Sequence, residues 1–195
     1  DGRPGAQSCD ESGCSCPPLG PTSGWRRHVG GHGAQEIHAV AVTATGAIVL
    51  GGGFSGSLDL GAGSQLAAGG SDGFVAWLAP DGTPIATWIL GGEGHAVVTD
   101  VAVDPSGDVA VVGWFDGTLD PGAPGNAAAT EPLVSNGQHD AFVLRLRSDG
   151  SVLSRAFGGE LFDSFTTVAF AGDDVIAGGA YQGRPQVGDQ QLIST

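Results

Sequence analysis

Short runs of apolar residues alternate with turns rich in Gly, Pro and Asp from residue 25 to the end of the chain. The Gly and Pro residues leave no stretch with the period of about 3.6 residues that marks an amphipathic helix. Dipeptides such as Asp81-Gly82 and Asp149-Gly150 readily supply the positive φ angles that tight β-hairpins demand. The pattern predicts β-strands at residues 25–29, 35–43, 47–54, 73–79, 84–90, 96–103, 108–115, 141–147, 152–157, 163–170 and 175–181.

One stretch of this pattern occurs three times. The second copy, residues 91–117, reads GGEGHAVVTDVAVDPSGDVAVVGWFDG, and the other copies occupy residues 30–56 and 158–183. Each copy opens with a Gly pair, and the positions that stay in register are the apolar Val40, Val101 and Val168 and the aromatic Phe54, Phe115 and Tyr181. The copies are spaced by 61 residues (30 to 91) and 67 residues (91 to 158). A period of this size predicts a repeat architecture.

Four short strands joined by hairpin turns, repeated about every 60 residues, are typical of a β-propeller blade. We therefore expect an all-β fold of about three four-stranded blades, the last incomplete, in units 25–87, 88–153 and 154–195. Because propellers usually close with about 4 to 8 blades, this number favours part of a larger propeller. Self-association and an open arc are the alternatives, and an unpaired sheet edge would promote association.

Composition narrows the class of protein. The 195 residues suffice for one domain with a sizeable core, and the 36 Gly stand at repeat positions, which argues against low-complexity disorder. A net charge of −14 makes the surface repel phosphate backbones, so nucleic acid is not expected as a partner. No run of about 18 apolar residues is present, so no transmembrane helix is expected.

Residues 1–24 lack apolar periodicity and predict a flexible leader that contains all three cysteines, Cys9, Cys14 and Cys16. One interpretation is a small disulfide knot in an exported protein, with Cys9 bonded to Cys14 or to Cys16. The other is a leader whose disulfide is incidental or intermolecular. A zinc site would need a fourth ligand, and no nearby His completes a usual spacing.

The second copy carries a distinctive set of residues: VAVD at 101–104, Gly107, Gly113, Phe115, Gly117, Leu119-Asp120 and DAFV at 140–143. This set resembles the bacterial β-propeller repeat known as the SBBP repeat. The first copy departs from it with Thr43 in place of Asp104, and the third also lacks that Asp. The resemblance covers residues 25–195. It implies an exported bacterial protein, whether extracellular, periplasmic or on the cell surface, and it implies no catalytic motif.

Two histidines are candidate binding residues. His32 and His95 lie in the loops that follow the first and second Gly pairs. In a propeller such loops gather at one end of the central channel, where a binding or catalytic cluster could form. The alternative is that both are solvated loop residues without a function.

Four aspartates recur at loop–strand junctions. Asp59 and Asp120 occupy one aligned position, and Asp72 and Asp140 occupy another. Carboxylates at such junctions could bind calcium, the only cofactor that the sequence gives reason to consider. More often such an Asp caps a turn by accepting a bond from its own backbone, and this role is favoured. The sequence also contains no calcium-loop motif.

We expect a non-catalytic binding or scaffold module that is exported and acidic and that presents propeller loops to protein or glycan partners. The loops at 61–71 and 121–139 vary in length between copies and are the expected contact surface. The alternative is a propeller enzyme, a lyase or hydrolase, with its site in the central channel. No motif of a hydrolase elbow, a phosphate loop or a zinc protease supports that alternative.

Overall fold

The structure, a computed structural model, describes residues 8–10, 13–15, 25–27, 30–61, 63–122, 131–187 and 190–191. The regular structure in these residues is entirely β-strand, and the paired strands run antiparallel. The expected all-β class is thereby confirmed. In the described part of the chain, no helix is long and apolar enough to cross a membrane.

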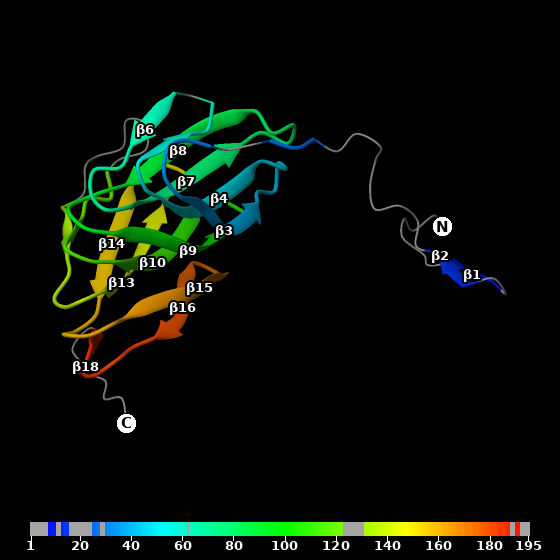
Figure 1. The fold of residues 1–195 in the computed structure, drawn as a ribbon. Helices are drawn as coiled ribbons and strands as arrows, with labels where there is room; N and C mark the ends of the chain where they lie inside the picture. The colour runs from blue at the N-terminus through cyan, green and yellow to red at the C-terminus, as the bar shows by residue number, and fades with distance from the viewer. Residues whose placement is uncertain are drawn as a thin grey trace.

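Three sheets form the body of the molecule (Figure 1). The first sheet has the order β3-β4-β7-β8, with β3 (Gln35–Val42), β4 (Ile48–Phe54), β7 (Asp72–Leu78) and β8 (Pro84–Leu90). The second sheet repeats it with β9 (Ala96–Val103), β10 (Val109–Phe115), β13 (Asp140–Leu146) and β14 (Val152–Phe157). The third sheet pairs β15 (Ser164–Ala171) with β16 (Asp174–Ala180).

Among the described residues, four short two-stranded sheets lie outside these three sheets, two of them in segments between the main strands and two beyond them. The sequence predicts loops at 61–71 and 121–139, but each holds one strand of a small hairpin. These sheets are β5 (Ser57–Asp59) with β6 (Ser64–Leu66), β11 (Thr118–Leu119) with β12 (Leu133–Val134), β17 (Gln186–Val187) with β18 (Gln190–Gln191), and β1 (Ser8–Asp10) with β2 (Gly13–Ser15).

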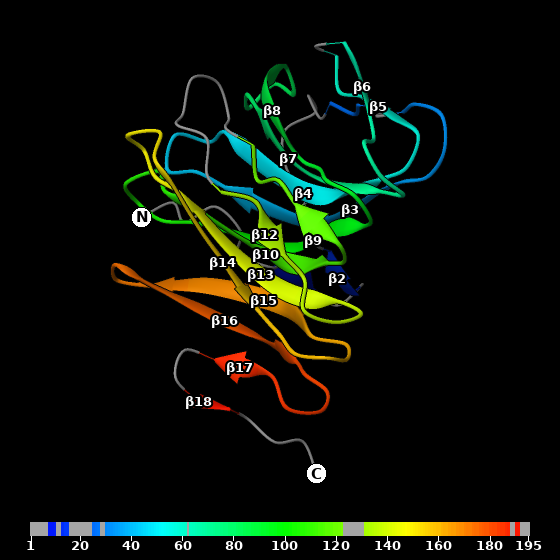
Figure 2. The same ribbon diagram turned by 90° about the vertical axis from the view of Figure 1, so that its left-hand side faces the viewer.

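The three main sheets stack face to face in chain order (Figure 2). Strand β9 of the second sheet lies against β3 and β4 of the first, and β15 of the third lies against β9 and β10. The larger core fills the first of these junctions and includes Val49, Val75, Val98, Val101, Phe115 and Phe142. A second core, containing Ala110, Val112 and Val168, fills the other junction. Burying each large apolar side chain stabilises the stack by about 1.5–3 kcal/mol.

A β-bulge recurs in the first strand of each sheet and accounts for a repeated glycine. The bulge in β3, β9 and β15 pushes one backbone carbonyl toward the second strand. Opposite it stand Gly52, Gly113 and Gly179, where an added Cβ would lie 1.9, 1.9 and 2.0 Å from that carbonyl oxygen. Only glycine fits at this position of the repeat.

Several strand predictions are confirmed to the residue, at 84–90, 96–103 and 152–157. The strand predicted over 25–29 is wrong for residues 25–27, which lie outside any strand, while residues 28–29 lie outside the described part. Trp25 instead donates its indole N–H to the Pro80 carbonyl, 2.8 Å away. Residues 25–27 therefore anchor to the β7–β8 turn rather than to a sheet.

Candidate binding surface at the loop end

One end of the stack collects the loops that carry most of the candidate residues. We call it the loop end: β3, β9 and β15 begin there, and β4, β10 and β16 end there. Isolated bridges join Ser71 to His95 and His139 to Phe162, so each sheet's loop touches the loop of the next sheet. The loop end is therefore one connected surface.

A cluster centred on Asp116 lies on this surface. Its Oδ2 atom is 3.1 Å from His95 Nδ1 and 3.7 Å from His139 Nε2, and its Oδ1 accepts the His95 backbone N–H at 2.7 Å. The Trp114 ring stacks on His139 with centroids 4.3 Å apart, and Phe162 meets His139 edge to face at 4.8 Å. We call these five residues the Asp116 cluster.

The Asp116 cluster combines aromatic rings with polar side chains, as the binding surfaces of proteins commonly do. One carboxylate stands between two imidazoles, and two aromatic rings flank it. His95 and Phe162 are exposed, while the other three are partly buried. Exposed aromatic area beside polar groups of fixed geometry favours binding of a partner that offers both apolar surface and hydrogen bonds.

The structure places the two predicted histidines differently. His95 belongs to the Asp116 cluster. His32 lies exposed in the equivalent loop of the first sheet, where its backbone N–H donates to Ser57 Oγ at 2.8 Å. Within the described residues, no group of three His, Cys, Asp or Glu side chains is arranged to hold a metal ion.

Asp59 and Asp120 are exposed, and each closes a turn. Asp59 Oδ1 accepts the N–H of Gly61 at 2.6 Å, and Asp120 Oδ1 accepts that of Gly122 at 2.8 Å. A carboxylate that accepts the N–H two residues ahead forms an Asx turn. This geometry is that of the turn role.

Asp72 and Asp140 are buried and fasten the loop that precedes the third strand of their sheets. Asp72 Oδ2 accepts the Ala68 N–H at 2.9 Å, and Asp140 Oδ2 accepts the Asn136 N–H at 3.0 Å. Burial raises the pKa of both carboxyls above the ordinary value, although these backbone bonds oppose the rise. The first Gly of the next Gly pair leaves room for each carboxylate, since an added Cβ on Gly91 or Gly158 would collide with it.

Cys9 and Cys14 are partners in the register of β1 and β2. Cys16 lies outside the described residues. The disulfide knot stays a prediction.

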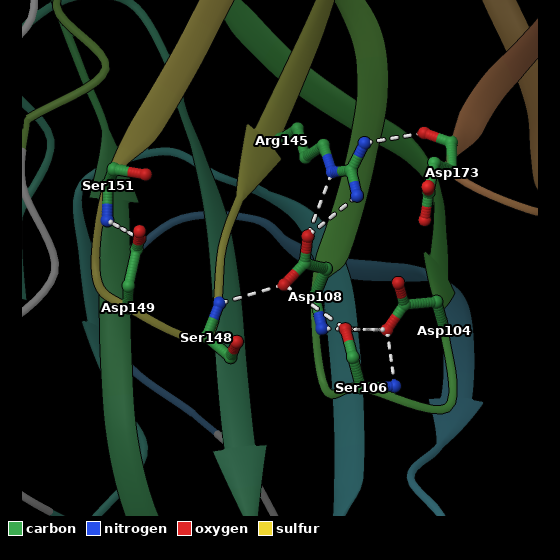
Figure 3. A network of polar contacts seen from close by, with 8 residues as sticks. All are labelled: Asp104, Ser106, Asp108, Arg145, Ser148, Asp149, Ser151 and Asp173. Atoms are coloured by element: carbon green, nitrogen blue, oxygen red, sulfur yellow. Dashed lines mark hydrogen bonds and ion pairs between the residues drawn. The ribbon is translucent and has the colours of Figure 1, made fainter.

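A second polar cluster (Figure 3) lies at the end of the stack where β10 begins and β13 ends, opposite the loop end. Asp108 Oδ2 accepts Arg145 Nε at 2.9 Å and Nη2 at 2.8 Å, while its Oδ1 accepts the Ser148 N–H at 2.8 Å. Arg145 also donates to the Asp173 carbonyl at 2.6 Å, which ties the second sheet to the β15–β16 turn. Since its acceptors are occupied by neighbouring donors, this cluster serves the fold rather than a ligand.

Sequence reasoning missed four members of the Asp116 cluster: Trp114, Asp116, His139 and Phe162. A usable signal was present in the alignment of the copies. Trp114 stands where the other copies have Gly53 and Ala180, and Asp116 stands where they have Ser55 and Gln182. Positions at which one copy departs from the others at a loop are candidates for function, because the repeat itself does not require the new residue.

A scan against protein-family models finds no match, and a search of the curated proteins finds none either. Function is therefore argued from the site and not from a relative.

Proposed function

We propose that this chain is a non-catalytic binding or scaffold module, built from β-propeller blades and exported to the periplasm, the cell surface or the extracellular medium. Two features support the blade assignment: sheets of one strand order recur along the chain, and they stack face to face in sequence order. The resemblance to the SBBP repeat supports an exported location. The partner is a protein or a glycan.

The observation that carries the binding role is the Asp116 cluster. It draws His95, Asp116 and His139 from three separate loops and adds Phe162 from the loop that leads into the third sheet. A surface assembled from several loops of a rigid scaffold is the usual site of recognition. Its side chains serve no visible need of the core, since the corresponding residues of the first sheet, Ser55 and Ser71, are small and polar.

The net charge of −14 restricts the partners. Neutral glycans and neutral or basic proteins approach such a surface without repulsion, whereas anionic polymers do not. Phe162 can stack on the apolar face of a sugar ring or on an apolar side chain. Asp116 and His95 can then bond its hydroxyl or amide groups.

Replacing Phe162 by Ala is expected to weaken ligand binding about tenfold or more, since exposed aromatic residues often dominate recognition. The full chain is passed over panels of immobilised neutral glycans and of extracellular proteins, and the affinity of each ligand found is measured for the variants. Trp25→Ala is the matched control. Trp25 is 44% exposed and Phe162 41%, but Trp25 lies at the opposite end of the stack beside Pro80.

The control separates a local effect from a general one. Equal loss of affinity in Trp25→Ala and Phe162→Ala would place binding elsewhere, and so would unchanged affinity in Phe162→Ala. A ligand recovered chemically unchanged after prolonged incubation supports the non-catalytic role.

One observation favours the enzyme alternative. Asp116 contacts His95 Nδ1 at 3.1 Å, the arrangement by which a carboxylate orients an imidazole that acts as a general base. Under this second candidate the chain is a lyase or hydrolase, and His95 abstracts a proton from the substrate. Turnover of a bound glycan by the wild type and its loss in His95→Ala would establish it.

A further inference from the structure

Among the described residues, the two outermost faces of the stack carry exposed apolar side chains, and the repeat shows what covers the equivalent faces inside the stack. We call the side of a sheet that faces the next sheet its forward face, and the opposite side its backward face. On the backward faces, Val101 and Val168 occupy one aligned position and are 5% and 7% exposed. The same position in the first sheet is Val40, which is 65% exposed. Ile37, aligned with the fully buried Val98, is exposed as well.

The forward face of the third sheet is exposed in the same way, at a position that is buried in the first and second sheets. Val49 and Ala110 occupy one aligned position in the first and second sheets, and both are 0% exposed. The corresponding residue of the third sheet is Ile176, which is 56% exposed. An apolar side chain that is buried in two copies and open in the third marks a surface shaped for contact.

The two junctions inside the stack show which contacts the outer faces would make with a further sheet. Between the first and second sheets, Val98 and Val101 press against Gly51, so closely that an added Cβ there would lie 2.6 and 2.8 Å from their methyl groups. Between the second and third sheets, Val168 packs against Ala110 and Val112. In both junctions a forward face receives the valines of a backward face.

Polar groups fix the register of the second junction. The Thr99 hydroxyl, at the β9 bulge, donates to the Phe165 carbonyl at 2.6 Å and contacts the Val112 carbonyl at 3.2 Å. The neighbouring Asp100 Oδ2 accepts the Val168 N–H at 2.8 Å. These bonds pair two β-bulges across the sheets.

The third sheet repeats the part of this arrangement that lies within one sheet. The Thr166 hydroxyl, at the β15 bulge, contacts the Gly178 carbonyl at 3.5 Å, which corresponds to the contact of Thr99 with Val112. Thr166 is exposed, and so is Thr167, which corresponds to Asp100. Both hydroxyls therefore stand where a further backward face would meet them.

We propose that a second copy of this chain docks there, head to tail, with the backward face of its first sheet on the forward face of the third. Val40 of one copy would then pack on Gly178 and beside Ile176 of the other. The Thr166 hydroxyl would donate to the Ile37 carbonyl, and the Thr167 hydroxyl would accept the Val40 N–H. A second copy is the occupant because both halves of the contact lie on this chain and match its interior junctions.

Such an interface is heterologous, because the two contributing faces differ. Each copy keeps one face free to engage another, so association continues until the stack closes on itself. It is independent of the Asp116 cluster, which lies at the loop end of the sheets.

The test uses one blocked face at a time. Val40→Asp blocks the backward face and Ile176→Asp blocks the forward face, and both residues are exposed, so the fold tolerates the change. Each variant alone is expected to lose self-association by about 30-fold or more, because a carboxylate would be buried in an apolar contact. Mass is measured by sedimentation over a range of concentrations, in reductant so that the leader cysteines cannot link copies.

Mixing the two blocked variants is the decisive step. Val40→Asp keeps an intact forward face and Ile176→Asp an intact backward face, so an equimolar mixture is expected to form a one-to-one dimer and nothing larger. Leu66→Asp is the control: Leu66 is 76% exposed, and its counterpart Val134 is 62% exposed although it lies in an interior repeat. This variant should associate as the wild type does.

A monomeric wild type at all concentrations would overturn the proposal and assign these faces to something other than a second copy. A mixture that stays monomeric while the wild type associates would also overturn it, because association would then use other surfaces. Equal weakening by Leu66→Asp would have the same consequence.

Discussion

The Gly52→Ala variant is expected to lose about 3 kcal/mol or more of unfolding free energy, whereas Gly53→Ala should stay within about 0.5 kcal/mol of the wild type. A Cβ on Gly52 would lie 1.9 Å from the Glu36 carbonyl oxygen and 3.0 Å from the Phe74 ring. Because the carbonyl belongs to the bulged strand β3, it cannot move without breaking the β3–β4 pairing.

Gly53 is the matched control because it is the next residue of the same strand. Its added Cβ would meet Val97 at 3.4 Å, an ordinary contact, and the aligned residues Trp114 and Ala180 are larger. Urea unfolding followed by tryptophan fluorescence gives both free energies. Similar losses in the two variants would show that the bulge does not dictate the repeated glycine.

The Asp108→Asn variant is expected to cost about 3 kcal/mol at neutral pH. Asp108 is buried and accepts two bonds from Arg145 and one from the Ser148 N–H. The substitution leaves the guanidinium without its counterion and turns an amide donor toward it. This value is at the low end of the free-energy cost of breaking a buried ion pair, because the Arg145 side chain keeps 17% of its surface exposed to solvent.

This loss should depend on pH in a defined direction. Burial by itself would raise the pKa of Asp108, but the bonds from Ser148 and Arg145 outweigh it and hold the pKa below the ordinary value of 3.8. A carboxyl with a depressed pKa stabilises the fold fully above its unfolded pKa, and this contribution fades as the pH falls through the folded value. The gap between wild type and Asp108→Asn is therefore expected to be constant near neutrality and to shrink below about pH 3.8.

Unfolding free energies at neutral and acidic pH test this, with Asp149→Asn as the control. Asp149 is exposed and accepts the Ser151 N–H in a surface turn, so its replacement should have a much smaller effect. A gap for Asp108→Asn that is independent of pH would mean that the charge of Asp108 is unimportant and that only its shape matters.

The strands were predictable because their signal is local. Apolar runs bounded by the Asp81-Gly82 turn, the second Gly pair and the turn at 104–107 located β8 and β9 to the residue. The small hairpins, such as β11 with β12, were not predictable, because strands of two residues carry no periodicity. Trp25 was misjudged for a related reason: its apolar ring is held by one bond to Pro80 and not by a strand neighbour.

The Asp116 cluster was only partly predictable because its contacts join residues distant in sequence. His95 could be singled out from its place after a Gly pair. The contact itself could not be predicted, since the sequence does not reveal that His95 and His139 both approach the same oxygen of Asp116. The turn role of Asp59 and Asp120 was easier to predict, because an Asx turn involves only the Asp and the next two residues.

Both the connected loop end and the exposed outer faces depend on the stacking of equivalent sheets. Proton–proton contacts in solution test this stacking most directly. Nuclear Overhauser effects are predicted from the Val98 and Val101 methyl groups to the Gly51 α-protons, one of which occupies the place of the missing Cβ. The corresponding effects are predicted from the Val168 methyl groups to Ala110 and Val112. Observation of both sets would establish the same junction twice in one chain. Absence of either set, with the strand pairings of each sheet intact, would contradict the stack.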